Sequence, residues 1–337
     1  MSQVASESVV AAGHGPQLGE GGEPSRQVIG RSPWDLFWRR FRQDKFAFFG
    51  IVTIVVMILL AVFAGVIAKF VAHHGVNQVF IRDQPGLPGA LDELGLPKGP
   101  SKVFWFGGDT AGRDLLVRVL YGARTSLIVA FLATGISLII GVTMGMIAGF
   151  YRGKIDTLVS RTMDVVMSLP VLLLALGLVS ACGATKEGCL GGFLRPGLLL
   201  VSYVIGFFNW PYIARIVRGQ VLSLREKEFI EASRAMGAGN LRIMRREILP
   251  NVVAPIIVYT TLIIPNNVLF EAALSFLGVG VPASTPSWGR MLSDAGTLFT
   301  VAWWMMLFPG LFLFLTTLAF NLVGDGLRDA LDPRTGR

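Results

Sequence analysis

The side chains best suited to catalysis are few in this sequence and lie in unsuitable places. All three histidines, His14, His73 and His74, fall outside the long apolar runs, so no membrane-embedded imidazole can act as a general base or a metal ligand. The nearest approach to a phosphate-binding G-x-x-x-x-G-K-[ST] loop, from Gly149 to Lys154, lacks both the spacing and the hydroxyl residue. We therefore expect no catalytic residue, no metal and no cofactor, and any ATP-driven work must be done by a partner.

The most informative polar stretch is the long connection 218–250. Its pattern predicts two helices separated by a glycine, because Gly237 can adopt the positive φ that ends a helix. Such an elbow, with small residues at its tip, fits a knob that docks in a groove on a soluble partner. A solvated hairpin that only joins two spans fits the same pattern. The residues expected at the docking contact are Glu231, Ala232, Ser233, Gly237, Leu249 and Pro250.

A second polar group lies inside apolar runs. Asn209, Asn266, Asn267 and Glu271 are costly to place in lipid, since a charged side chain at the centre of a spanning helix costs about 2.5–3.5 kcal/mol. Such residues usually face a cavity or a partner. Asn267 and Glu271 stand four residues apart on a helix, so we expect them to satisfy each other. Hydrogen bonding between helices and contact with a transported solute both remain open for the four residues.

The elements that must position these residues are membrane helices. Of 337 residues, 53% are apolar and 15% are charged, against about 25% charged in an average soluble domain. Several stretches exceed the roughly 18 nearly uncharged residues that mark a spanning helix. The sequence therefore predicts an all-α integral membrane fold with kinks at Pro170, Pro255 and Pro265. The six predicted spans are 46–68, 125–150, 163–180, 197–217, 252–277 and 299–323.

The segments outside the spans have distinct compositions. Residues 1–31 hold scarcely any large apolar side chain and predict a disordered tail. Residues 32–45 predict an amphipathic helix in the headgroup layer, capped by Ser32 with Pro33 at its first position, although a soluble helix packed on a core is an alternative. Its apolar face would carry Trp34, Phe37, Trp38 and Phe41. The remaining units are 69–124 outside the membrane, a core at 125–323, and a C-terminal segment at 324–337.

The basic residues determine the expected orientation. A net charge of +8 could suggest nucleic acid, but Lys and Arg gather in alternate loops rather than on one face. Two thirds of the 30 Lys and Arg fall on the side that holds both termini and the 218–250 connection, which predicts that side to be cytoplasmic. The only two cysteines, Cys182 and Cys189, then share an outward loop where a disulfide could form. A free Cys182 that packs as a small residue at a helix end is the alternative.

Several motifs resemble one family of membrane proteins. The run Glu231-Ala-Ser with Gly237 and Leu249-Pro250 resembles the EAA motif of ABC importer permeases. Further runs are similar to the C-type subunit of the dipeptide/oligopeptide permease family. They begin at Gly107, Tyr121, Trp210, Leu274 and Asn321. Ser233 stands in place of the motif's second alanine, and Gly108 where the family usually has threonine. The resemblance extends from about Pro33 to Arg334.

The resemblance implies a type I ABC importer permease fold with six transmembrane helices and cytoplasmic termini, in a bacterial inner membrane. It implies partners as well: a second homologous permease, two ATP-binding subunits and an extracytoplasmic substrate-binding protein. The subunit itself would do no bond chemistry. Asn209, Asn266, Asn267 and Glu271 would line the translocation path for di- or oligopeptides.

Other functions remain as alternatives at this point. The same machinery could import nickel, glutathione or another small peptide-like solute. An ion-driven secondary transporter would show internal repeats and buried carboxylates for coupling, and no convincing repeat is visible. An intramembrane enzyme is disfavoured by the positions of the three histidines.

Overall fold

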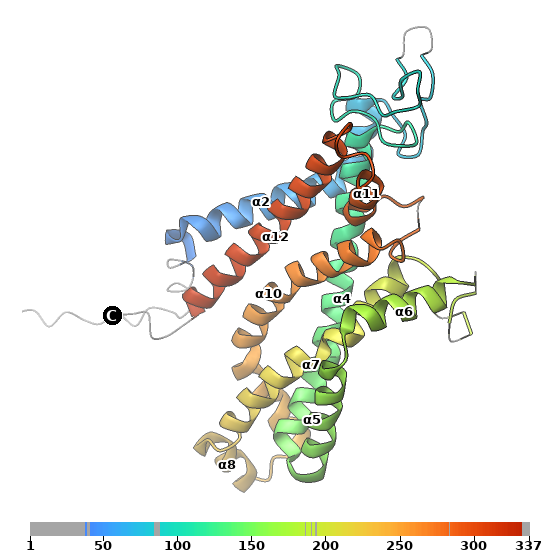
Figure 1. The fold of residues 1–337 in the computed structure, drawn as a ribbon. Helices are drawn as coiled ribbons and strands as arrows, with labels where there is room; N and C mark the ends of the chain where they lie inside the picture. The colour runs from blue at the N-terminus through green and yellow to red at the C-terminus, as the bar shows by residue number, and fades with distance from the viewer. Residues whose placement is uncertain are drawn as a thin grey trace, which may run out of the picture.

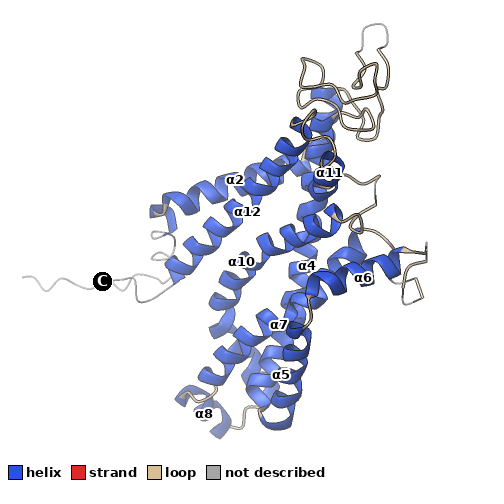
Figure 2. Ribbon diagram, viewed as in Figure 1, coloured by secondary structure: helices blue, strands red, loops and turns tan. Residues whose placement is uncertain are grey.

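The structure is a computed structural model that describes residues 38, 41–83, 88–185, 187–189, 191–192, 194–282 and 284–331. This part of the chain is helical, and its only β-pairing consists of isolated bridges (Figure 2). The predicted tail 1–31 and most of the predicted helix 32–45 lie outside the described residues. The helices are α2 Lys45–Val62, α3 Ala64–Ile67, η1 Ala68–Ala72, α4 Leu115–Tyr151, α5 Gly153–Ser168, α6 Val171–Gly183, α7 Leu198–Leu224, α8 Glu228–Ala235, α9 Asn240–Arg242, η2 Ile243–Ile248, α10 Leu249–Phe276, α11 Trp288–Ala295 and α12 Trp304–Leu331.

Five helical stretches in the described residues are long and apolar enough to cross a membrane: α2, α4, α7, the run from α9 to α10, and α12. A sixth span is reached by pairing α5 with α6, which meet at a bend of 84°. The bend lies at Leu169, which is extended (φ −85°, ψ 141°), because the following Pro170 disfavours helical backbone in the residue before it. The predicted all-α membrane fold is confirmed, and the kink expected at Pro170 is a full break.

Several helix boundaries differ from those expected, and three of the differences lengthen a helix. α4 begins at Leu115 rather than 125, because the Asp114 carboxylate accepts a hydrogen bond from the Leu116 amide at 2.9 Å and caps the helix. The connection 151–162 is the first part of α5, and α12 continues past 323 to Leu331. The added parts of α5 and α12 consist largely of polar residues, which a search for apolar runs leaves outside the helix. α10 continues as one helix through Pro255 and Pro265.

The centre of the fold is the pair α4 and α7, which pack along most of their length (Figure 1). Close approach is possible because α4 presents glycine every fourth residue. A Cβ at Gly141, Gly145 or Gly149 would lie only 2.7, 2.6 and 2.8 Å from atoms of α7. Stripes of small residues of this kind let membrane helices pack backbone to backbone. α2 runs beside α12, and α10 contacts both α12 and α7.

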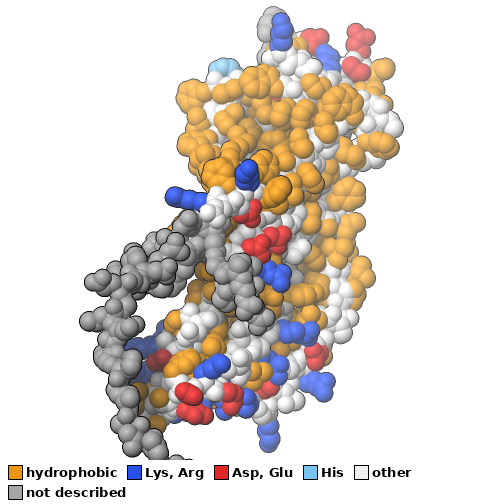
Figure 3. Space-filling view, turned by 90° about the vertical axis from the view of Figure 1, so that its left-hand side faces the viewer, with side chains coloured by type: hydrophobic (Ala, Val, Ile, Leu, Met, Phe, Trp, Pro, Cys, Tyr) orange, Lys and Arg blue, Asp and Glu red, His pale blue; other side chains and the backbone are white. Residues whose placement is uncertain are grey.

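The two ends of the molecule are formed by different segments of the chain. At one end, the segment after η1 folds onto the start of α4: His74 Nδ1 lies 2.6 Å from Asp114 Oδ2, and the His74 ring stacks on Phe104. Trp304, at the start of α12, donates a hydrogen bond to the Gly108 carbonyl of this segment. α8 lies at the opposite end (Figure 1). In Figure 3, hydrophobic side chains cover most of the upper part of the face, and charged side chains lie at its top, in its middle and at its lower end.

Candidate functional site

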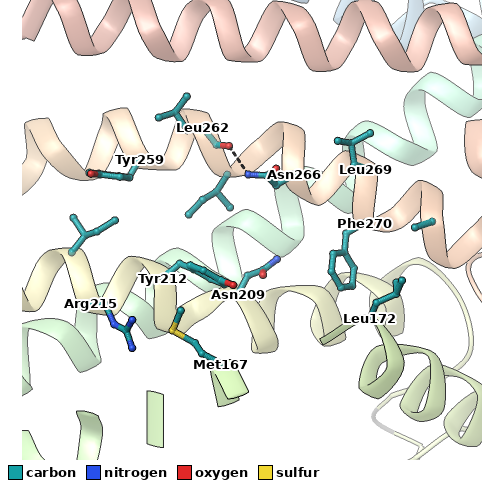
Figure 4. Close-up of a pocket in the computed structure, with 13 residues that line it drawn as sticks. Met167, Leu172, Asn209, Tyr212, Arg215, Tyr259, Leu262, Asn266, Leu269 and Phe270 are labelled. Carbon is teal, nitrogen blue, oxygen red and sulfur yellow. Dashed lines mark hydrogen bonds between the residues drawn. The ribbon is translucent and has the colours of Figure 1, made fainter. Parts of the chain in front are cut away.

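A cavity of about 890 Å³ lies between α7 and α10, and the end of α5 and the start of α6 close one side of it (Figure 4). This volume is within the range of small-molecule binding sites, roughly 300–1,000 Å³. The lining residues are Met167, Leu172, Asn209, Tyr212, Arg215, Ile216, Tyr259, Leu262, Ile263, Asn266, Leu269, Phe270 and Ala273. The broken span therefore has a direct role in shaping the cavity.

The polar groups of the cavity are amides and phenols. Asn209 and Tyr212 come from α7, and Tyr259 and Asn266 come from α10 across the cavity (Figure 4). Asn266 donates one hydrogen bond to the Leu262 carbonyl at 3.2 Å, and its carboxamide oxygen can accept others. These groups can hydrogen-bond to a solute, but they offer no nucleophile with an adjacent base. The site is suited to reversible binding rather than to bond chemistry.

Arg215 is the one charged side chain among the cavity-lining residues. Its Nη2 lies 2.9 Å from Asp164 Oδ1 of α5, and both side chains are about half exposed. Because the pair is exposed, it contributes little to stability. The ion pair uses only Nη2, so the other N–H donors of the guanidinium can reach another acceptor at the edge of the cavity.

Asn267 and Glu271 were expected on the path, but the structure places both in the interior with no exposed surface. Neither pairs with the other. Asn267 accepts from Asn209 Nδ2 at 2.7 Å and donates to the Thr134 hydroxyl at 2.8 Å, which joins α4, α7 and α10. The helix register explains the difference: residues 259, 262, 263, 266, 269, 270 and 273 of α10 share the cavity face, and 267 and 271 face α4.

Glu271 has its own partners in this interior. Ser126 of α4 donates to one carboxyl oxygen at 2.8 Å, and Ser275 donates to the other at 2.6 Å. A buried carboxyl group is tolerated only where donors satisfy its oxygens. Of the two roles left open by the sequence, these contacts support hydrogen bonding between helices for Asn267 and Glu271. Asn209 has both kinds of contact, since it lines the cavity and also donates a hydrogen bond to Asn267.

Sequence reasoning missed the two tyrosines of the cavity. Tyr212 follows Asn209 by three residues, and Tyr259 precedes Asn266 by seven, so each tyrosine shares a helix face with an asparagine already singled out. That spacing was the signal that could have found them. The spacing alone did not single out the tyrosines, because aromatic residues are common on lipid-facing and buried helix surfaces alike.

The predicted elbow is present as α8, a glycine turn, and the short α9. Gly237 has φ +84°, its amide donates to the Arg234 carbonyl at 2.9 Å, and the Ala238 amide donates to the Ser233 carbonyl at 3.0 Å. This pair of bonds satisfies carbonyl groups at the helix end, and glycine suits the left-handed backbone. Glu231 and Ala232 are exposed, whereas Ser233 is buried within the chain and Leu249 is half-buried.

α8 presents an exposed apolar stripe that sequence reasoning did not identify. Phe229 is 40% exposed, Met236 is 81% exposed, and Ala232 lies between them at helical spacing. On the other side of α8, Ile230 is fully buried and packs with the ends of α4 and α7. α8 is thus anchored on one face and exposes a methionine and an aromatic ring on another. Exposed apolar side chains gathered in this way mark an interaction surface.

A disulfide joins Cys182, in the last turn of α6, to Cys189 in the loop that leads to α7, and their Cα atoms are 5.0 Å apart. A smaller cavity of about 500 Å³ lies beside them and includes Gly183, Gly278 and Arg290. Within the described residues, no group of three or more His, Cys, Asp or Glu side chains could hold a metal ion.

Comparison with known proteins identifies the chain's relatives. The family model described as "Binding-protein-dependent transport system inner membrane component" matches residues 141–337. A second, "N-terminal TM domain of oligopeptide transport permease C", matches residues 32–85. A chain of the MetNI methionine ABC transporter, in an inward-facing conformation, has a TM-score of 0.53 at 22% identity and covers 65% of this chain and 97% of its own. This likeness shows the shared fold.

Two curated relatives match almost the whole chain. The "Dipeptide transport system permease protein DppC" of Alkalihalophilus pseudofirmus is 40% identical over 311 residues, 92% of this chain and 93% of the relative. The "Glutathione transport system permease protein GsiD" of Escherichia coli is 39% identical over 304 residues, 90% of this chain and 91% of the relative. The predicted permease fold, non-catalytic role and inner-membrane location are confirmed. The chain belongs to the family of binding-protein-dependent transport system inner membrane components.

Proposed function

We propose that this chain forms one half of the translocation path of an ABC importer for dipeptides or short oligopeptides, driven by ATPases that contact α8. The observation that carries the proposal is the cavity between α7 and α10. Its polar lining consists of amide and phenol groups with one arginine at the edge. The similarity to a dipeptide permease over 92% of the chain supports the same substrate class.

The chemistry of the lining suits a peptide main chain. Each peptide bond offers one donor and one acceptor, and the carboxamides of Asn209 and Asn266 can pair with both. Apolar and aromatic neighbours such as Phe270 accept side chains of many shapes without fixed charges. Binding of this kind depends weakly on peptide sequence, as a transport path requires, because a solute must leave the site as well as enter it.

Glutathione is a second candidate substrate. It is a tripeptide-like solute with two carboxylates, and Arg215 supplies the cavity with a guanidinium able to bind a carboxylate through two parallel hydrogen bonds. A glutathione permease is 39% identical to this chain. Nickel is disfavoured, because no His, Cys, Asp or Glu is among the residues that line the cavity.

The cavity also supports a second permease subunit as a partner. Tyr212, Tyr259 and Leu269 line it and remain 40–47% exposed, so the helices of this chain leave the cavity partly open. A homologous subunit with a similar face would complete the enclosure. On the resemblance to importer permeases, an extracytoplasmic binding protein would deliver solute to this dimer.

α8 is the proposed contact for the ATPases. Glu231, Ala232 and Gly237 belong to the EAA-like motif, and the exposed stripe of Phe229, Ala232 and Met236 would enter a groove on the ATPase. Leu249 and Pro250, at the start of α10, would pass the movement to the cavity. ATP binding would close the ATPase dimer, move α8 and switch the path from inward-open to outward-open; hydrolysis would reset it.

The experiment compares two substitutions on the same helix in the complete complex in lipid. Ala232→Asp places a charge in the middle of the stripe, and Ala235→Asp makes the same change on another exposed part of α8. We expect Ala232→Asp to insert normally, to retain less ATPase and to lose stimulation of ATP hydrolysis by loaded binding protein. Ala235→Asp should retain both. Normal retention and stimulation with Ala232→Asp would refute α8 as the coupling contact.

Substrate class is tested separately by uptake into the same vesicles. The vesicles are given labelled dipeptide, labelled glutathione or nickel in parallel experiments. Each experiment is done with ATP inside the vesicles and again with ATP outside them. The proposal expects ATP-dependent uptake of dipeptide. Uptake of glutathione alone would support the second candidate, and uptake of nickel alone would contradict both.

A further inference from the structure

The corner between α4 and α5 has an unusual backbone. Arg152 has φ +54° and ψ −167°, and the next residue, Gly153, has φ +59°. Among the described non-glycine residues, only His73 shares a positive φ. Residues held in such sparsely populated regions cost about 1–3 kcal/mol each and persist only where their surroundings hold them. The contacts that hold this corner come from the turn between α7 and α8 and from α8 itself.

Guanidinium groups from the elbow surround the last turn of α4. Arg225 Nη1 donates to the Phe150 carbonyl at 2.5 Å, and the guanidinium carbon of Arg225 lies 5.9 Å from the centre of the Phe150 ring. Arg234, on α8, lies 5.5 Å from the same ring. Arg152 forms an ion pair with Glu226, two residues before α8. The corner and the elbow therefore form one connected cluster.

A bidentate ion pair then fixes α5 to α7 one turn further along. Arg218 donates through Nε to one Asp156 oxygen at 2.5 Å and through Nη2 to the other at 2.8 Å. The side chains are only 30% and 19% exposed. Bidentate arginine–carboxylate pairs fix orientation as well as distance. This pair therefore sets the register and rotation of α5 against α7, which a single surface contact could not do.

α5 leads from this pair directly to the cavity. Met167, in its last turn, lines the cavity, and the bend at Leu169 brings Leu172 of α6 into the lining as well. A rotation of α5 at Asp156 would thus move the side of the cavity that α5 and α6 form. The connection through Leu249 and α10 reaches the opposite wall. The elbow has a physical contact with both sides of the cavity.

We infer that Asp156 and Arg218 are positioning residues that hold α5 in register with α7, so that movement of α8, which reaches the α4–α5 corner through Phe150 and Arg152, shifts α5 and its side of the cavity together with α10 in the transport cycle. This inference rests on the proposed function. The Arg152–Gly153 corner acts as the hinge, because its strained backbone is held by contacts that move with α8. Without the ion pair, the ATPases would stay bound and hydrolyse ATP, but their conformational cycle would no longer move α5.

The test uses the full complex reconstituted in vesicles, with uptake and ATP hydrolysis measured on the same preparation. The variants are Asp156→Asn, Arg218→Gln and the double substitution. Lys154→Gln is the matched control: Lys154 is exposed at the same corner, and the described residues give it no ion-pair partner. We expect solute transported per ATP to fall by at least about fivefold in both single variants, the lower end of typical allosteric coupling.

The double variant separates transmission from general damage. If the two residues act through each other, the double substitution costs no more than either single one. ATPase retention should match the parent in every variant. A parent-like ratio of uptake to ATP hydrolysis in Asp156→Asn overturns the inference and leaves the proposed function intact. Additive losses in the double variant, or an equal loss in Lys154→Gln, overturn it too. No ATP-dependent uptake by the parent complex overturns both proposals.

Discussion

Replacing Gly237 by alanine tests whether the left-handed turn after α8 is required. Gly237 has φ +84°, and a Cβ built there meets nothing within 4 Å. The substitution therefore brings no steric clash with other residues, and its cost is confined to the backbone. For an L-residue, a left-handed conformation costs about 1–2 kcal/mol. That cost shifts the balance between the observed turn and alternative conformations by a factor of about 5–30.

Gly239 supplies a matched control two residues away. It has φ −69° and ψ 153°, and a Cβ there also meets nothing within 4 Å. Any residue adopts this extended conformation, so Gly239→Ala should change stability little or raise it slightly. The comparison keeps the added methyl group and the loop constant, and changes only the sign of φ at the substituted position.

Hydrogen exchange measured by mass spectrometry on the complete complex in lipid reads the turn directly. The Ala238 amide, which donates to the Ser233 carbonyl, reports whether the turn is closed. We expect its exchange to accelerate about 5–30-fold in Gly237→Ala and to stay near the parent in Gly239→Ala. ATPase retention should fall only in the first. Equal exchange in the two variants would refute the argument from backbone conformation.

Two further predictions concern orientation and the buried polar groups. After reduction, an impermeant thiol reagent added to intact cells should label Cys182 and Cys189. The same reagent should not label a single cysteine that replaces exposed Arg234 in a protein whose two native cysteines are changed to serine. Labelling of position 234 from outside would contradict the predicted topology. Glu271→Gln should lower assembled complex and uptake in proportion, because two serine hydroxyls donate to the carboxyl group in the interior, at a cost of about 1.5–3 kcal/mol if they are lost. Asn266→Ala should instead lower uptake and leave the yield of assembled complex unchanged. If Asn266→Ala lowered the yield and Glu271→Gln lowered uptake alone, Glu271 would be the residue that contacts solute and Asn266 the structural one.

The sequence by itself determined the solvent, the fold class and the family. Long apolar runs exceed what any soluble helix needs, and the motif around Glu231 and Gly237 carried the resemblance that the relatives confirmed. The sequence also predicted the glycine turn after α8, because glycine adopts the positive φ that ends a helix whatever the rest of the fold. Pro170 marked the position of the break for the same reason, since proline restricts the residue before it.

Only the tertiary structure decided which polar residues face the cavity and which face another helix. Asn266 and Asn267 are neighbours in sequence, yet a rotation of about 100° per residue turns one into the cavity and the other toward Thr134 of α4. Apolar side chains surround all of these positions, so hydrophobic periodicity gives no indication of which face is which. The contacts of Arg152, Asp156 and Arg218 likewise join segments about 60 to 75 residues apart. Such pairings depend on how α4, α5 and α7 pack, and local sequence does not encode them.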